Sequence, residues 1–231
     1  MKKKLTAIIA ILVIILAGYG CWYYFKKAPK HKKNHGVAEY DTLIQPDHYK
    51  KIPVHDFSYV VIKCDLGPVK VYIKPDTTTS LEFHRSFMKY TDISYQGDTL
   101  IIHTYKTPES TKENPIYRQI YINTSDMKYY QAEATQTFFS DMKLPQLKVD
   151  NRSSYIRFYE CEIGQLDLAT NKSCNYVLDD NCFINKVRAN INTNSSMTML
   201  AYVETEIALK NKQLYNITLS DENIRKLKLI K

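Results

Sequence analysis

The chain has 231 residues, of which 44% are hydrophobic and 24% are charged, a globular composition that excludes a collagen-like or wholly disordered chain. Its formal net charge is +8. Eight lysines between residues 1 and 35 account for all of that charge, because the other 24 basic residues balance the 24 acidic ones. The rest of the chain is neutral, so charge gives no reason to expect nucleic acid as a partner.

The N-terminal segment predicts a membrane-spanning helix. Residues 5–25 form an uncharged run of 21 residues, and a helix of that length crosses a hydrocarbon layer of about 30 Å. Aromatic residues cluster from Trp22 to Phe25, where such rings prefer the headgroup region, and lysines follow them. We expect residues 1–25 to be an uncleaved signal anchor in the inner membrane. Residues 5–25 would contact the lipid bilayer, and the rest of the chain would lie outside the cytoplasm, in the periplasm or cell envelope.

Two other treatments of this segment stay open. Gly18 and Gly20 form a small-x-small pair before Cys21, which is typical of signal-peptide cleavage and would give a secreted protein. Lipidation of Cys21 after cleavage would give a lipoprotein instead. Against this, Gly18 and Tyr19 stand where lipidation sites favour an aliphatic and a small residue.

A linker and a β-rich region come next. Residues 26–57 begin with a lysine-rich run and show no sustained apolar period, so they predict a basic linker or stalk. From residue 58 apolar residues alternate with polar ones, as between Val69 and Lys74, which is typical of strands. Glycine and proline turns separate the short runs. We expect an antiparallel β meander and an exposed loop over residues 58–115, at the start of a domain that spans residues 58–231.

Residues 116–231 contain an internal repeat of about 20 residues. One apolar column, with spacings of 19, 21, 20 and 20, consists of Leu147, Leu166, Val187, Ile207 and Leu227. A second column recurs in step, at Phe158, Leu178, Met199 and Leu219. Met127 and Tyr129 extend the first column backward, and Phe138 extends the second. Two short strands in 20 residues suit one coil of a parallel β-solenoid, or β-helix. A β-sandwich with coincidental spacing is the alternative.

With these features the sequence resembles the head GIN-domain family of candidate auto-transporter adhesins. The resemblance rests on an export segment, the run Val69 to Ile73, the run Tyr95 to His103, and the short β repeats that follow. It covers roughly residues 58–231. Asn, Lys and Ser occupy the corners here, whereas the family usually turns on Gly-Ser pairs. The resemblance implies an all-β, right-handed parallel β-solenoid in the cell envelope.

Few residues suggest a metal site. Glu160, Asp180 and Asp221 share one repeat offset, so stacked carboxylates are the candidates for a Ca²⁺ site, although Ala201 interrupts the series. Solvated corner residues are the simpler interpretation. Two histidine pairs are also candidates: His31 with His35 in the linker, and His84 with His103 on neighbouring strands of the meander. Surface histidines explain both pairs as well.

The cysteines leave the redox state open. Cys161 and Cys182 share a repeat offset and are expected to lie one above the other, either as a disulfide or as free thiols packed as small hydrophobes. Cys64 and Cys174 show no pairing pattern. The sequence contains neither a Cys-x-x-Cys pair nor a Gly-x-Ser-x-Gly elbow, so we assign no catalytic residue and expect no cofactor.

Two classes of function fit these patterns. The first is a non-catalytic envelope protein that binds a glycan, a surface polymer or another protein through its flank, with binding residues that the sequence does not identify. The second is a polysaccharide-processing enzyme of the β-helix type, a fold analogy that requires converging carboxylates. We favour binding. We also expect a monomer, because Lys226, Lys228 and Lys231 interrupt the last strand and discourage edge pairing.

Overall fold

The computed structural model describes residues 48–65, 68–105, 117–210 and 216–229. The expected anchor, His31 and His35, Cys21, most of the linker and the loop expected before residue 116 lie outside these ranges. Within the described part of the chain, no helix is both long enough and apolar enough to cross a membrane.

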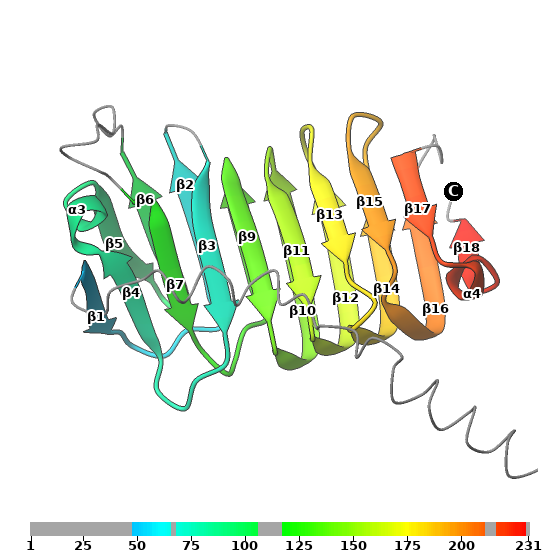
Figure 1. The fold of residues 1–231 in the computed structure, drawn as a ribbon, viewed down its shortest axis with the longest axis horizontal. Helices are drawn as coiled ribbons and strands as arrows, with labels where there is room; N and C mark the ends of the chain where they lie inside the picture. Colours follow the sequence, from blue (N-terminus) through cyan, green and yellow to red (C-terminus); the bar gives the residue numbers. More distant parts are fainter. Residues whose placement is uncertain (1–47, 66–67, 106–116, 211–215, 230–231) are drawn as a thin grey trace, which may run out of the picture. The chain divides into compact units, whose positions relative to one another are not determined.

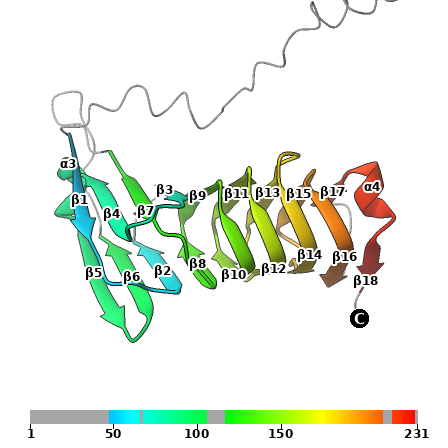
Figure 2. The same cartoon turned by 90° about the horizontal axis from the view of Figure 1, so that it is seen from below.

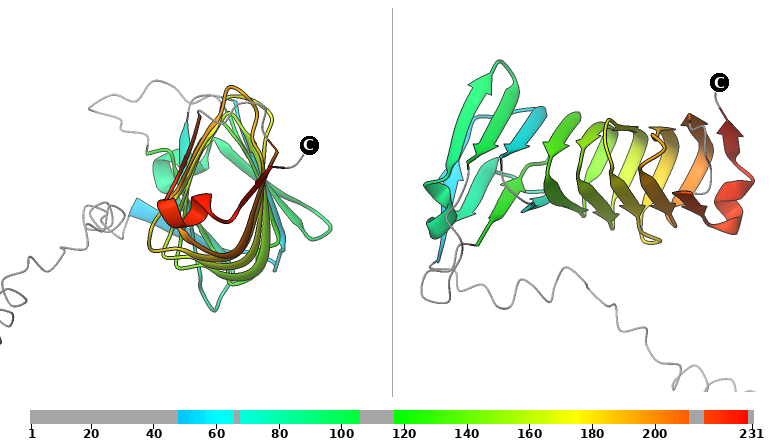
Figure 3. Two further views of the ribbon diagram at one scale, coloured as in Figure 1. Left: turned by 90° about the vertical axis from the view of Figure 1, so that its right-hand side faces the viewer. Right: turned by 90° about the horizontal axis from the view of Figure 1, so that it is seen from above.

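The described residues form two nine-stranded sheets. Sheet A contains, in spatial order, β1 (Tyr49–Pro53), β4 (Ser80–His84), β7 (Gln119–Asn123), β3 (Val69–Lys74), β9 (Thr135–Ser140), β11 (Tyr155–Tyr159), β13 (Asn175–Leu178), β15 (Ser196–Met199) and β17 (Ile217–Leu219). Sheet B contains β18 (Leu227–Leu229), β16 (Tyr202–Lys210), β14 (Phe183–Asn190), β12 (Glu162–Thr170), β10 (Lys143–Arg152), β8 (Tyr129–Glu133), β2 (Tyr59–Cys64), β6 (Thr99–Thr104) and β5 (Thr91–Gln96). The fold is all-β, as expected. Viewed along the row of strands, the two sheets face each other (Figure 3).

From β8 onward the chain alternates between the sheets, and each strand pairs in parallel with the second strand after it (Figure 1). The first predicted column is confirmed, since register partners run in order through Leu147, Leu166, Val187, Ile207 and Leu227. The second is confirmed in the same way through Phe158, Leu178, Met199 and Leu219. Side chains in these columns bury one another because strands in a sheet lie only about 4.8 Å apart.

The backward extension of the columns is wrong by one residue at Tyr129 and at Phe138, whereas Met127 is buried in the core as predicted. Val149 pairs with Tyr130 rather than with Tyr129, and Phe158 pairs with Phe139 rather than with Phe138. The spacing at this point is 19 residues, so a constant step of 20 moves the assignment by one place. Side chains alternate between the two faces of a strand, and a shift of one therefore exchanges the inner face for the outer face.

The N-terminal strands do not form the predicted antiparallel meander. β2 lies in sheet B between β6 and β8 and is parallel to both, whereas β3 lies in sheet A between β7 and β9 and is parallel to both. Of the expected hairpins, the described residues contain the one between β5 and β6, where Gly97 adopts a φ of 60°. The remaining antiparallel pairs join β4 to β1 and to β7.

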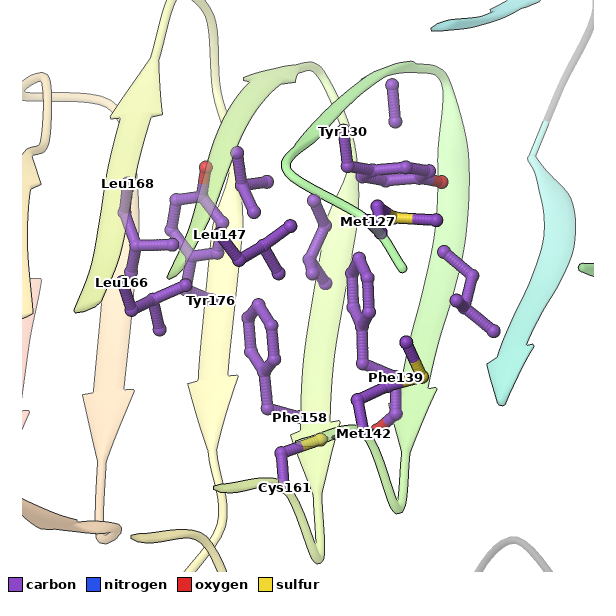
Figure 4. Packing of buried hydrophobic residues seen from close by; sticks show 14 of the residues in the cluster. Met127, Tyr130, Phe139, Met142, Leu147, Phe158, Cys161, Leu166, Leu168 and Tyr176 are labelled. Atoms are coloured by element: carbon purple, nitrogen blue, oxygen red, sulfur yellow. Dashed lines mark hydrogen bonds between the residues drawn. The ribbon is translucent and has the colours of Figure 1, made fainter. Parts of the chain in front are cut away.

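The core fills the space between the sheets. Phe139 and Phe158 stack with ring centroids 4.8 Å apart, and both side chains are fully buried beside Met142 and Cys161 (Figure 4). Tyr130 is also fully buried, and its hydroxyl lies 2.6 Å from the Thr137 hydroxyl, which satisfies its hydrogen-bonding requirement. Burial raises the pKa of Tyr130 well above its usual value.

Small polar side chains form the corners between the sheets. Asn151 accepts a hydrogen bond from the Ser154 backbone N–H at 3.0 Å, and the Ser154 hydroxyl accepts one from the Thr135 N–H at 3.0 Å. Two repeats after Ser154, the Ser195 hydroxyl accepts a hydrogen bond from the Cys174 N–H at 3.1 Å. These residues satisfy backbone donors where strand pairing stops, which explains why Asn and Ser recur at this offset.

Short helices lie near the two ends of the described region (Figure 2). α3 (Arg85–Met88) buries Phe87, and α4 (Asp221–Ile224) buries Asn223. The Asn223 side-chain amide donates to the backbone oxygens of Ala201 at 2.8 Å and Met199 at 3.3 Å. Asn223 therefore satisfies carbonyl groups near the C-terminal end of the repeats.

Candidate binding surface

A depression of about 380 Å³ lies on the outer face of sheet B. Its outward-facing side chains come from two neighbouring rows across β10, β12, β14 and β16, and small alanines in both rows leave the space open. One row runs through Lys148, Asp167, Arg188 and Ala208, and the other runs through Ala169, Asn190 and Lys210. Leu168 and Ala189 complete the lining from the inner positions between the rows.

A second depression of about 300 Å³ adjoins the first and shares Lys148 and Asp167 with it. It extends the surface toward the N-terminal strands, and its other lining residues are Tyr59, Lys128, Tyr129, Gln146 and Leu147. Tyr59 and Tyr129 belong to the same row as Lys148, because they are register partners on β2 and β8. We call the two depressions together the trough.

The basic side chains of the trough carry uncompensated charge. Lys148, Arg188 and Lys210 are exposed and form no ion pair with any residue that the structure describes. The neighbouring row of the same sheet is different, since Glu206 lies 3.3 Å from both Lys186 and Lys228. Those two contacts lower the pKa of Glu206. Among the strands that form the trough, the basic side chains that line it thus differ from Lys186 and Lys228, which share an acidic partner.

The acidic residues near these cations have other partners. Asp167 stands in register between Lys148 and Arg188, yet its carboxylate accepts two hydrogen bonds from the Gln165 side-chain amide, at 2.9 and 3.2 Å. Asp150 accepts a hydrogen bond of 2.7 Å from the Asn171 side chain and lies 3.4 Å from Arg152. Neither carboxylate therefore forms an ion pair with Lys148, Arg188 or Lys210.

Two tyrosines form the far end of the trough. The rings of Tyr59 and Tyr129 lie 6.2 Å apart at an angle of 42°, and Tyr59 is 40% exposed. The Lys148 ammonium lies 6.0 Å from the Tyr129 ring centroid. Burial, followed by the charge of Asp150, raises the pKa of Tyr129, so its hydroxyl stays protonated and polar at neutral pH.

A second exposed aromatic pair offers a poorer surface for a ligand. Phe183 and Tyr202 stack at 5.3 Å and are 45% and 41% exposed. Phe183 covers one face of Tyr202, and the Lys226 ammonium lies over the Tyr202 ring, 4.3 Å from its centroid. Because Phe183 and Lys226 already contact the Tyr202 ring, we interpret this pair as a packing contact between neighbouring repeats.

The carboxylates predicted for Ca²⁺ do not form a metal site. Glu160 follows β11, Asp180 is exposed after β13, and Asp221 begins α4. Across the described ranges, no group of three or more His, Cys, Asp or Glu residues is arranged to hold a metal ion. Glu160 instead interacts with Asp141 on the preceding repeat.

The predicted histidine pair is also separated. His84 ends β4 in sheet A, and His103 lies on β6 in sheet B, so the expectation of neighbouring strands is wrong. His84 accepts a hydrogen bond from the Ser86 N–H and is the N-cap of α3. His103 lies 2.9 Å from Asp65. The two histidines do not lie together because the N-terminal strands that carry them belong to different sheets.

The described cysteines, Cys64, Cys161, Cys174 and Cys182, are free thiols. Cys161 and Cys182 are neighbours on adjacent repeats, as predicted, and the Cys182 sulfur accepts a weak hydrogen bond from the Cys161 N–H at 3.5 Å. A hydrogen bond to Cys182 and burial raise the pKa of Cys161. Cys64 has a pKa raised to about 11, mainly by burial. The environments of Cys64 and Cys161 disfavour thiolates, whereas the hydrogen bond with Cys161 lowers the pKa of Cys182.

The trough residues were not among the predicted site residues, although the sequence contains a signal for them. Each residue of the outer row directly follows a member of the first apolar column, so the row can be read one position after that column. It gives Lys148, Asp167, Arg188, Ala208 and Lys228. The pattern does not reveal which of these charges are paired, because the partners come from other rows.

Comparison with solved structures finds similar chains at low sequence identity, one of them with a TM-score above 0.5. A candidate adhesin from Bacteroides fragilis aligns with 79% of this chain and 93% of its own, with a TM-score of 0.52 and 12% identity. A candidate adhesin from Parabacteroides merdae covers 79% and 95% with a TM-score of 0.40 and 12% identity. A candidate lipid-binding protein from Parabacteroides distasonis covers 79% and 96% with a TM-score of 0.38 and 12% identity. No family model and no curated protein matches the chain.

Proposed function

We propose that this chain is a membrane-anchored, non-catalytic binding protein of the cell envelope, and that the trough is its ligand site. The observation that carries the proposal is the cluster of exposed, unpaired basic side chains over two adjoining depressions. Concave sites with a few convergent polar groups are where proteins usually bind ligands. The Bacteroides fragilis protein that shares the fold is described as a candidate adhesin, which supports a binding role. The head GIN-domain resemblance points the same way.

The architecture that we propose for the repeats is a right-handed parallel β-solenoid. Parallel pairing of every second strand supports it, as do the two apolar columns, which stay in register from Leu147 to Leu227 and from Phe158 to Leu219. Crossovers between parallel strands are right-handed in nearly all proteins. Such a stack places one outward row of side chains across successive repeats, which suits an elongated ligand.

We further propose that residues 5–25 anchor the domain in the inner membrane, with the trough outside the cytoplasm. A full-length protein that resists carbonate extraction and keeps Met1 to Gly20 in mass spectrometry is the expected result. A mature chain that begins at Cys21 would contradict the uncleaved anchor and support the lipoprotein alternative.

A glycan array tests the binding function. We expect the full-length chain, held in detergent micelles, to bind a subset of glycans, and an Arg188→Glu variant to lose those signals. Incubation of each bound glycan with the chain, followed by an assay for new reducing ends or unsaturated products, tests the polysaccharide-processing alternative. If a bound glycan is cleaved, and if that cleavage requires an intact trough, the non-catalytic part of the proposal is overturned. If no glycan, surface polymer or envelope protein bound, the proposed function would fail.

A further inference from the structure

We propose that the trough selects a polyanionic polysaccharide, which lies across the strands with its acidic groups at Lys148, Arg188 and Lys210. This inference rests on the proposed binding function and adds the chemical class of the ligand. Its basis is the combination of three unpaired cations with carboxylates that are already engaged by internal hydrogen bonds.

The charge arrangement favours an anion. Asp167 stands between Lys148 and Arg188 in the row but forms no ion pair with either of them. Its single negative charge faces four basic lining residues, Lys128, Lys148, Arg188 and Lys210, so the trough keeps a net positive charge. An incoming carboxylate or sulfate would form charge-assisted hydrogen bonds with side chains that have no ion pair among the described residues to break. Such bonds contribute more than neutral ones because the donor and the acceptor are both ionised.

The spacing favours a chain rather than a single small anion. Lys148 and Arg188 are two strands apart, about 9.6 Å at the usual strand separation. Lys210 lies on β16, one strand beyond Arg188 and in the neighbouring row. The trough continues in the other direction to β8 and β2, so acidic groups repeated along one polymer can meet successive cations.

The other lining groups favour carbohydrate among polyanions. Gln146 and Asn190 present side-chain amides that can pair with sugar hydroxyls, and Tyr59 and Tyr129 present rings and hydroxyl groups. Nucleic acid needs many phosphate contacts for affinity at physiological salt, whereas four basic side chains line the trough, Lys128, Lys148, Arg188 and Lys210. The trough is also short of the large apolar side chains that would insert into a lipid surface.

The experiment measures affinity for polygalacturonate, a uronic acid polymer, by isothermal titration calorimetry on the full chain in detergent micelles. The test variant is Lys148→Gln with Arg188→Gln. The control is Lys143→Gln with Lys172→Gln, which removes the same charge from two exposed lysines that are ion-paired with Glu162 and Glu133, outside the trough. We expect the test variant to bind at least about tenfold more weakly and the control to change by less than about twofold. Unchanged thermal melting would show that both variants fold.

Three results would overturn the inference. An equal loss of affinity for polygalacturonate in the test and control variants would show that binding depends on net charge alone. Equal affinity for neutral dextran would remove the requirement for acidic groups while leaving the binding function intact. Stronger binding to duplex DNA or to anionic phospholipid vesicles than to polygalacturonate would assign the trough to another class of polyanion. Failure of the wild-type chain on every ligand in the glycan array would instead count against the proposed function itself.

Discussion

Asp141 and Glu160 stand at the same corner of successive repeats, and both have a left-handed backbone, with φ of 58° and 51°. Burial raises the pKa of the Asp141 carboxyl, and the hydrogen bond and charge of Glu160 raise it further. The pair has the signature of two carboxyl groups that compete for one proton. It therefore stores unfavourable charge repulsion at neutral pH.

The first prediction is that Asp141→Asn increases the free energy of unfolding at pH 7. The folded-state pKa of Asp141 lies above its unfolded value, so the folded protein binds the extra proton and this site loses stability as pH rises above 3.8. Asparagine removes the charge and tolerates the left-handed backbone. Urea denaturation between pH 4 and 8 measures the effect. Glu160→Gln should give a similar gain, and the double variant should gain less than the sum. Full additivity would show that the two carboxyl groups do not interact.

The second prediction concerns the apolar column. Leu178 is fully buried between Phe158 and Met199, so Leu178→Asp should cost about 4 kcal/mol or more, or prevent folding. The adjacent Val177 is partly exposed on the outer face, and Val177→Asp should cost no more than about 1 kcal/mol. Thermal and urea denaturation compare the two variants. Similar losses in both would contradict the assigned inner and outer faces.

The third prediction is a pH dependence at His84. Burial, followed by the charge of His48, lowers the pKa of His84 below its usual 6.5. Because the unfolded chain then binds the proton more readily, this site contributes stability above pH 6.5 that is lost as pH falls through 6.5 toward the folded pKa. The His48 ring stacks on His84 at 5.7 Å, and the Tyr49 and Tyr117 rings contact it at 5.4 and 4.6 Å.

His84→Asn tests this origin, because asparagine can still cap α3 but does not titrate. We expect a smaller fall in melting temperature between pH 7 and pH 5 than in the wild type, whatever the absolute stability of the variant. An unchanged pH dependence would place its origin in other groups.

The fourth prediction concerns the outermost strand, β18. Lys228 lies 3.3 Å from Glu206, and Lys226 lies 3.3 Å from Glu222 and also contacts the Val203 backbone oxygen. Replacement of Lys226, Lys228 and Lys231 by threonine should cause self-association, because the lysines that interrupt this edge are removed. Light scattering after size-exclusion chromatography of the full chain in one detergent measures the mass. A wild-type dimer through this edge would contradict the prediction.

The repeat was predictable because its period is written directly in the sequence. Apolar residues from Leu147 to Leu227 recur at nearly constant spacing, and stacked strands place equal offsets next to one another. The period failed before residue 140, where the step became 19 and Tyr129 was assigned to the wrong face. A repeat that is one residue shorter still fits an average spacing of about 20, but the shift exchanges the inward-facing and outward-facing side chains of the strand.

The sequence by itself determined the all-β class, the apolar columns, and the concentration of basic charge near the N-terminus, since each depends on local pattern or composition. Only the tertiary structure decided which strands pair with one another and which charged side chains form ion pairs. It placed β2 and β3 in different sheets, so the expected meander and the pairing of His84 with His103 did not form. It also separated Lys228, which has an acidic partner in Glu206, from Arg188, which has none among the described residues. Both outcomes depend on contacts between residues far apart in the chain, and a single sequence does not record such distances.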